Sequence, residues 1–138
     1  MNVVRSKLEG DWFMENLTAE EKQQSVEAFK SIIRKSEKAL THMKTDAPQT
    51  RLPEKRMKAA RIGVDTLLAR WEGQELDVSK TDLIEAKKEL EGLLLTLPSF
   101  LKKQKEGSGQ RTYITRRIKA CKVAVFYMDD LIEKFEQA

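Results

Sequence analysis

Apolar residues recur at alternating steps of three and four along four long segments of this chain, and no other feature constrains its fold as strongly. This spacing brings one side chain per turn to the same face of an α-helix, whereas a strand needs alternation with period two, which is nowhere sustained. In the first segment the series consists of Val26, Phe29, Ile33, Ser36, Leu40 and Met43. Ser36 is the one polar residue in the four series. The sequence therefore predicts an all-α protein whose helices share one core.

The predicted helices have recognisable ends. Thr18 and Ser79 each begin an N-capping pattern ahead of an apolar series. Pro53 is tolerated in a first helical turn and is expected to open the second helix, while Gly73 supplies a left-handed end for it. Pro98 falls inside the third series, where it removes a backbone hydrogen bond, so we expect a kink or an early end there.

The breaks between the four segments are short, which makes consecutive helices antiparallel neighbours. We therefore expect an antiparallel up-down-up-down four-helix bundle over residues 18–137. The 138 residues fit a single helical domain over 1–138. Residues 1–17 are too apolar for a free tail, and we expect this short N-terminal apolar segment to pack on the bundle as a strap or a short helix.

The third and fourth predicted helices are apolar on more faces than one core needs. The side chains expected to face outward are Leu95, Val123, Phe126 and Tyr127. A helix that is apolar on every side is normally covered by something. Two covers remain open: residues 1–17 of the same chain, or a second copy in a twofold homodimer.

The net charge is only +4, but the basic residues are concentrated in two stretches. Residues 100–122 hold eight lysines and arginines against one glutamate, and residues 44–61 hold six against two acidic residues. In an antiparallel bundle both stretches lie at the same end. The residues expected to bind an anionic partner there are Lys55, Arg56, Lys102, Lys103, Arg111, Arg116 and Arg117. Tyr113 is available for stacking. The alternative is a solvated basic face without a ligand.

Residues suited to catalysis are sparse. The one histidine, His42, cannot supply the paired motifs of a di-iron bundle, and the one cysteine, Cys121, occupies an inward position of its series. A remote alternative is a magnesium-dependent nucleotide hydrolase at the opposite, acidic end. Its candidate carboxylates are Glu72, Glu75, Asp129, Asp130, Glu133 and Glu136. We expect no enzymatic activity, no metal and no cofactor.

No run reaches the roughly 18 apolar residues of a membrane span, and a single cysteine excludes an internal disulfide framework. These features predict a cytoplasmic protein without a membrane partner. The leading interpretation is a non-enzymatic binding module whose basic end docks an acidic protein or a nucleic acid. The alternative is a self-associating structural protein that forms a homodimer through the apolar face of the third and fourth helices.

Overall fold

The computed structural model describes residues 13–43 and 48–137, and this part of the chain is all-α, without strands. Its regular elements are the helices α2 (Ala19–Thr41), α3 (Arg51–Glu72), α4 (Lys80–Lys102) and α5 (Gly109–Gln137), with one 3-10 turn, η1 (Pro48–Thr50), directly before α3. Residues 13–15 form a helical turn ahead of α2. The expectation of an all-helical protein is confirmed.

The predicted N-caps and the glycine end are confirmed as well. Thr18 and Glu21 form a reciprocal capping box, in which the Thr18 hydroxyl accepts from the Glu21 amide at 3.1 Å. The Ser79 hydroxyl accepts from the Asp82 amide at 3.0 Å and caps α4. Gly73 follows α3 with a φ of 70°, a left-handed conformation that glycine adopts without steric cost.

Helix α4 continues through Pro98, so the expectation that the helix ends early at this proline is wrong. The proline leaves the carbonyl of Leu94 without its helical donor. Pro98 and Ser99 are exposed, so water can reach this part of the backbone. Leu97 is buried on the opposite side and holds the last turns of α4 against the protein.

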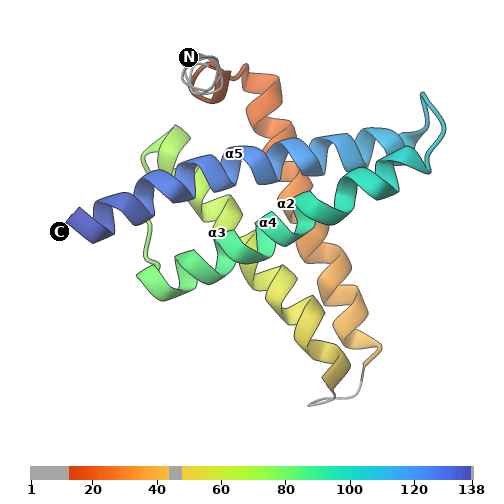
Figure 1. Ribbon diagram of the computed structural model, residues 1–138, viewed down its shortest axis with the longest axis horizontal. Helices are drawn as coiled ribbons and strands as arrows, with labels where there is room; N and C mark the ends of the chain where they lie inside the picture. The colour runs from red at the N-terminus through yellow and green to blue at the C-terminus, as the bar shows by residue number, and fades with distance from the viewer. Residues whose placement is uncertain (1–12, 44–47, 138) are drawn as a thin grey trace.

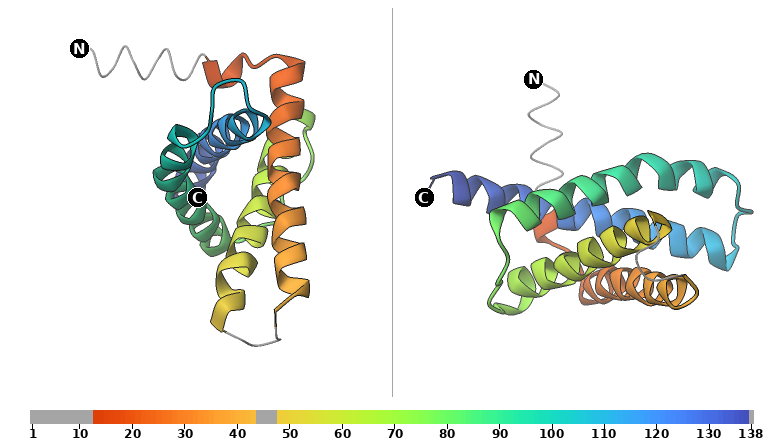
Figure 2. Two further views of the ribbon diagram at one scale, coloured as in Figure 1. Left: turned by 90° about the vertical axis from the view of Figure 1, so that its right-hand side faces the viewer. Right: turned by 90° about the horizontal axis from the view of Figure 1, so that it is seen from below.

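The four long helices form two antiparallel hairpins that cross (Figure 1). In that view the α2–α3 hairpin runs from top to bottom, whereas the α4–α5 hairpin runs from side to side. Figure 2 shows from other directions that the hairpins lie against each other as two layers. The expected bundle of four aligned helices is therefore not confirmed. The far ends of the two hairpins lie at different extremities, so the two basic stretches do not meet at one end.

One hydrophobic core occupies the place where the hairpins cross. Its fully buried large side chains come from all four helices and include Phe29, Leu67, Leu90 and Met128. Gly63 of α3 brings the backbones of α2 and α3 close together, because a Cβ atom at this position would lie 3.0 Å from the nearest ring atom of Phe29. The core thus fixes the spacing within the first hairpin and its position against the second.

The described part of the N-terminal segment packs against α3 and α5. Leu17 is buried, and the backbone carbonyl of Met14 accepts a 2.7 Å hydrogen bond from the hydroxyl of Tyr127. The same hydroxyl accepts from the indole N–H of Trp71 at 2.9 Å. Residues 13–17 thus cover part of α5, in agreement with the expectation that the N-terminal segment of the same chain covers this helix. Residues 1–12 lie outside the described part of the chain.

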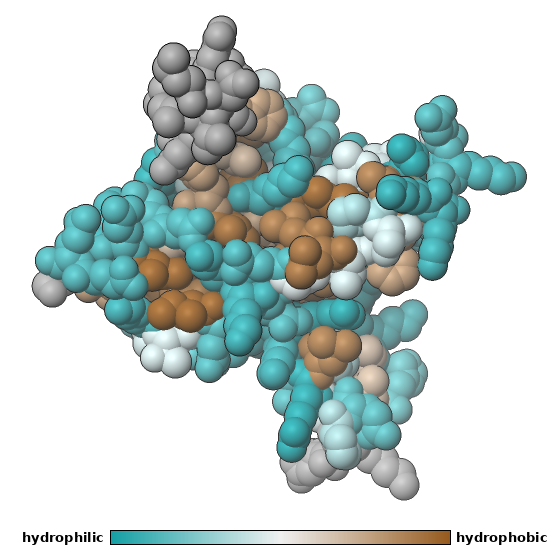
Figure 3. All heavy atoms as spheres, viewed as in Figure 1, coloured by the Kyte–Doolittle hydropathy of each residue, from teal (hydrophilic) through white to brown (hydrophobic). Residues whose placement is uncertain are grey.

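This packing corrects part of the expected oligomer face. Val123 is fully buried and Tyr127 is only 2% exposed, so both belong to the chain's own core. They point inward because α5 packs directly against α4, α2 and α3. Phe126 is half-buried, and Leu95 alone of the four is widely exposed, at 85%. Figure 3 shows hydrophobic side chains on this face as separate patches between hydrophilic ones.

Candidate functional site

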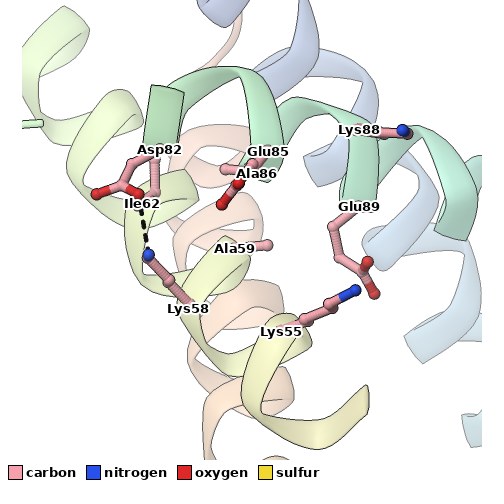
Figure 4. A pocket seen from close by; sticks show the side chains of 9 residues that line it. All are labelled: Lys55, Lys58, Ala59, Ile62, Asp82, Glu85, Ala86, Lys88 and Glu89. Carbon is pink, nitrogen blue, oxygen red and sulfur yellow. Dashed lines mark hydrogen bonds and ion pairs between the residues drawn. The ribbon is translucent and has the colours of Figure 1, made fainter. Parts of the chain in front are cut away.

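The seven basic residues expected to bind one anionic partner are distributed over different parts of the structure. Lys55 lies in a groove between α3 and α4, where it and Glu89 point toward one another (Figure 4). The same groove holds the ion pair of Lys58 with Asp82, at 2.9 Å. Glu85 lines it too, so carboxylates offset the positive charge there. This groove is not suited to an anion.

Three of the other predicted residues lie at the far end of the α4–α5 hairpin. Arg111 donates from Nη1 to the backbone carbonyls of Leu101, at 3.1 Å, and Gln104, at 3.5 Å. These carbonyls lie in the last turn of α4 and directly after it, where the regular helical hydrogen bonds end. Lys102 and Lys103 are exposed on the last turn and the C-cap of α4. Arg111 therefore has a structural contact, and the two lysines face water.

Two further predicted residues line a single cavity of about 380 Å³. They are Arg56 of α3 and Arg117 of α5, and Lys35 of α2 lines the same cavity. We call this cavity the basic notch. It lies between the crossing hairpins, since all four long helices contribute to its lining. Its other lining residues are apolar or uncharged, namely Ile32, Ser36, Leu93, Thr96, Leu97, Phe100, Gln104, Gln110 and Ile114. No carboxylate lines it.

The cations of the basic notch have no acidic partner within the described chain. No ion pair with a described carboxylate is formed by Lys35, Arg56 or Arg117. The Nε atoms of both arginines are buried and have no hydrogen-bond acceptor. Among the described residues, every other buried side-chain nitrogen or oxygen has a hydrogen-bond partner. Nη2 of Arg117 donates to the hydroxyl of Ser31 at 3.3 Å. Buried donors without acceptors are rare in proteins and costly.

The electrostatics of the notch follow from this arrangement. The charge of Arg117 is the main cause that lowers the pKa of Lys35 from its ordinary value, and burial adds to it. Burial also lowers the pKa of the Arg117 guanidinium, which nevertheless stays protonated at any physiological pH. The notch therefore holds positive charges that repel one another and that no carboxylate compensates. Such a site favours an anion with several oxygen acceptors, because guanidinium groups bind carboxylate and phosphate bidentately.

A second cavity, of about 320 Å³, lies on the other side of Arg117, which lines both. Arg116 and Tyr113 line this second cavity, so the structure places them beside the notch and not inside it. Tyr113 is exposed, as stacking requires. Glu27 also lines the second cavity and pairs with Arg34 at 2.7 Å. The cationic surface thus continues from the notch past Arg117, but it meets a carboxylate there.

Sequence reasoning missed Lys35, because it lies outside the two basic stretches. The neighbouring Ser36 carried a usable signal: it interrupts the apolar series of the first helix, and it lines the notch. A polar residue in a core series indicates a place where the core gives way to a polar cavity.

The residues considered for catalysis have the following surroundings in the structure. Burial raises the pKa of the Cys121 thiol to about 12, so it is protonated at neutral pH. Among the described residues no three histidine, cysteine, aspartate or glutamate side chains gather as a metal site would require. At the expected acidic end Asp129 pairs with Lys87, and Asp130 contacts Arg70 at 3.5 Å and Lys134 at 3.3 Å. These carboxylates already have cationic partners.

Comparisons with known proteins give no further guidance: no protein family, curated protein or solved structure matches this chain. None of the described helices combines the length and the apolar run needed to cross a membrane.

Proposed function

We propose that this protein is a non-enzymatic binding module that holds an anionic group of its partner in the basic notch. One observation carries the proposal: Lys35, Arg56 and Arg117 line the same cavity from three different helices, and no carboxylate lies among them. Charged groups in proteins are normally paired when they are partly buried. Arg56 and Arg117 are partly buried and have no acidic partner, which a ligand that supplies negative charge would explain, and the exposed Lys35 adds a third positive charge at the same cavity.

An anion in the notch would improve the protein's own interactions. It would supply the negative charge that the partly buried guanidinium groups of Arg56 and Arg117 lack. It would also offset the repulsion that lowers the pKa of Lys35. A hydrogen bond to a charged group contributes about 1.5–3 kcal/mol when it is protected from water. The notch is partly open, so we take the lower part of that range for each arginine.

The sequence suggested that a whole basic end of the molecule binds an acidic protein or a nucleic acid. The present proposal places anion binding at a smaller site, the basic notch. Only Arg56 and Arg117 of the seven expected residues belong to it. The homodimer alternative is weaker, because Val123 and Tyr127 are buried in the core of one chain.

Isothermal titration calorimetry with inorganic phosphate at low ionic strength tests the proposal. The variant R56Q/R117Q removes two positive charges from the notch. The matched control K102Q/K105Q removes two from exposed positions outside it. We expect the notch variant to weaken phosphate binding at least tenfold, which corresponds to about 1.4 kcal/mol, and the control to change it less than twofold.

Two results would contradict the proposal. Equal weakening by both variants would mean that phosphate responds to overall charge and not to the notch. Absence of saturable binding to the unaltered protein would mean that the notch holds no phosphate. The single variant R56Q gives a second measurement if R56Q/R117Q does not fold, because Arg56 makes no hydrogen bond or ion pair with another described residue.

A further inference from the structure

Resting on the proposed function, we infer that the ligand of the basic notch is a phosphate monoester that carries an apolar body. The reason is that the cations share their cavity with apolar side chains from three helices. These side chains are Ile32, Leu93, Leu97, Phe100 and Ile114. A site for a bare anion has no use for such a lining, since hydrated ions gain nothing from apolar walls.

The size of the notch agrees with a ligand larger than an inorganic ion. Its volume is about 380 Å³. At about 30 Å³ per water molecule in the liquid, this is space for about a dozen water molecules. A phosphate ion has five heavy atoms and would leave most of that space to water. Small-molecule sites begin at about 300 Å³ and are mostly apolar with a few polar groups that fix the orientation.

The charge of the notch favours phosphate over carboxylate. Three cations face no carboxylate, and a phosphate monoester carries about −1.5 to −2 at pH 7, whereas a carboxylate carries −1. The monoester also offers three terminal oxygens, one for each of the three cations that line the notch. A carboxylate offers only two oxygens.

Phe100 is the side chain that the apolar body would cover. It lines the notch and is 51% exposed, so a ligand can bury its ring without opening the core. Lys103 lies with Nζ 5.6 Å from the centre of this ring. Leu95 lies on the same helix and is more exposed, but it does not line the notch. The two residues therefore form a natural comparison.

Neither of the two other cavities described above combines these properties. The groove of Figure 4 is lined by Asp82, Glu85 and Glu89, which would repel a phosphate. The cavity beyond Arg117 contains Glu27. Of these three cavities, the basic notch is the one in which cations without carboxylates and an apolar wall occur together.

The test is calorimetric titration with inorganic phosphate, methyl phosphate, butyl phosphate and hexyl phosphate, each below its aggregation concentration. Every methylene that leaves water for an apolar site raises affinity roughly fourfold. Because the notch is partly open, we expect the gain from methyl to hexyl phosphate to be at least tenfold overall. Hexanol tests the apolar part alone, and hexanoate tests a carboxylate with the same number of carbon atoms. We expect no saturable binding of hexanol, and hexanoate at least tenfold weaker than hexyl phosphate.

The variants F100S and L95S locate the effect. We expect F100S to reduce the ratio of hexyl to methyl phosphate affinity at least threefold, and L95S to leave this ratio unchanged. The ratio of the two affinities isolates the contribution of the alkyl chain, because both ligands carry the same phosphate group.

The outcomes separate this inference from the proposed function. If inorganic phosphate binds in the notch but chain length adds nothing, the apolar body is refuted and anion binding stands. If hexanoate binds as tightly as hexyl phosphate, the assignment of phosphate is overturned. If F100S and L95S change the ratio equally, the chain does not lie where we place it. If no phosphate binds at all, both proposals fail.

Discussion

The substitution Gly63→Ala should destabilise this protein, although alanine normally favours a helix over glycine. Gly63 lies in the middle of α3 against Phe29 of α2. A Cβ atom at this position would lie 3.0–3.1 Å from three atoms of the Phe29 ring. The ring is fully buried, so it has no free space into which it can move.

The two opposing contributions can be estimated. Alanine in a helix interior gains about 0.5–1 kcal/mol over glycine. Forcing an extra carbon into a packed core costs about 1–3 kcal/mol. We therefore expect Gly63→Ala to lower the free energy of unfolding by about 1–2 kcal/mol. Gly92, in the middle of α4, is the matched control, because a Cβ atom there would meet nothing within 4 Å. Gly92→Ala should raise stability by about 0.5–1 kcal/mol.

Urea unfolding followed by circular dichroism measures both changes, and the slope of free energy against urea should stay constant. The double variant F29L/G63A adds a further check. Leucine lacks the ring atoms that the new Cβ atom would approach, so alanine at position 63 should cost much less in the F29L background. Stabilisation by Gly63→Ala equal to that by Gly92→Ala would refute the close approach of α2 and α3.

Two more predictions concern single contacts. Tyr127→Phe removes the hydroxyl that accepts from Trp71 and donates to the N-terminal backbone, so it should cost about 1–2 kcal/mol in urea unfolding; an unchanged midpoint would mean that the N-terminal segment is not anchored there. The hydrogen bond from Lys119, followed by that from the Thr18 backbone, lowers the pKa of Glu21 to about 2 from 4.5. A depressed carboxyl pKa stabilises the fold above the unfolded value, and this contribution is lost as the pH falls from 4.5 to 2. Glu21→Gln keeps a capping acceptor, so its stability should fall less steeply than that of the unaltered protein in this window, and equal slopes would contradict the assignment.

The sequence was sufficient to predict the helices and several of their ends, because these depend on local interactions. The apolar period identifies which face of each helix is inside, and the caps at Thr18, Ser79 and Gly73 require only neighbouring residues. The crossing of the hairpins was not predictable in the same way. An apolar face packs well at several crossing angles, and the angle depends on how individual side chains interlock, as Gly63 and Phe29 do.

The candidate site shows the same division between local and non-local information. Counting charges along the chain selected Arg56 and Arg117, which the structure brings to one cavity. The same count also selected Lys55 and Arg111, whose surroundings are a carboxylate and backbone carbonyls. Lys35 was missed, since its role depends on which helix lies opposite. A charge count finds basic segments, but only the three-dimensional arrangement determines which cations are left without partners.

The crossing also explains why residues of a core series line a ligand site. Leu97, Phe100 and Ile114 fall at the three-and-four apolar spacing of the third and fourth segments, so in an aligned bundle they would face other helices. In two crossed hairpins the helices diverge away from the crossing, so these residues border the basic notch and Phe100 is half exposed. Phe135, at the other end of α5, is exposed for the same reason. What distinguishes the notch is that the diverging helices carry Lys35, Arg56 and Arg117 at its margin. The apolar wall is thus a consequence of the fold. The three cations beside it are what would let this wall bind the apolar part of an anionic ligand.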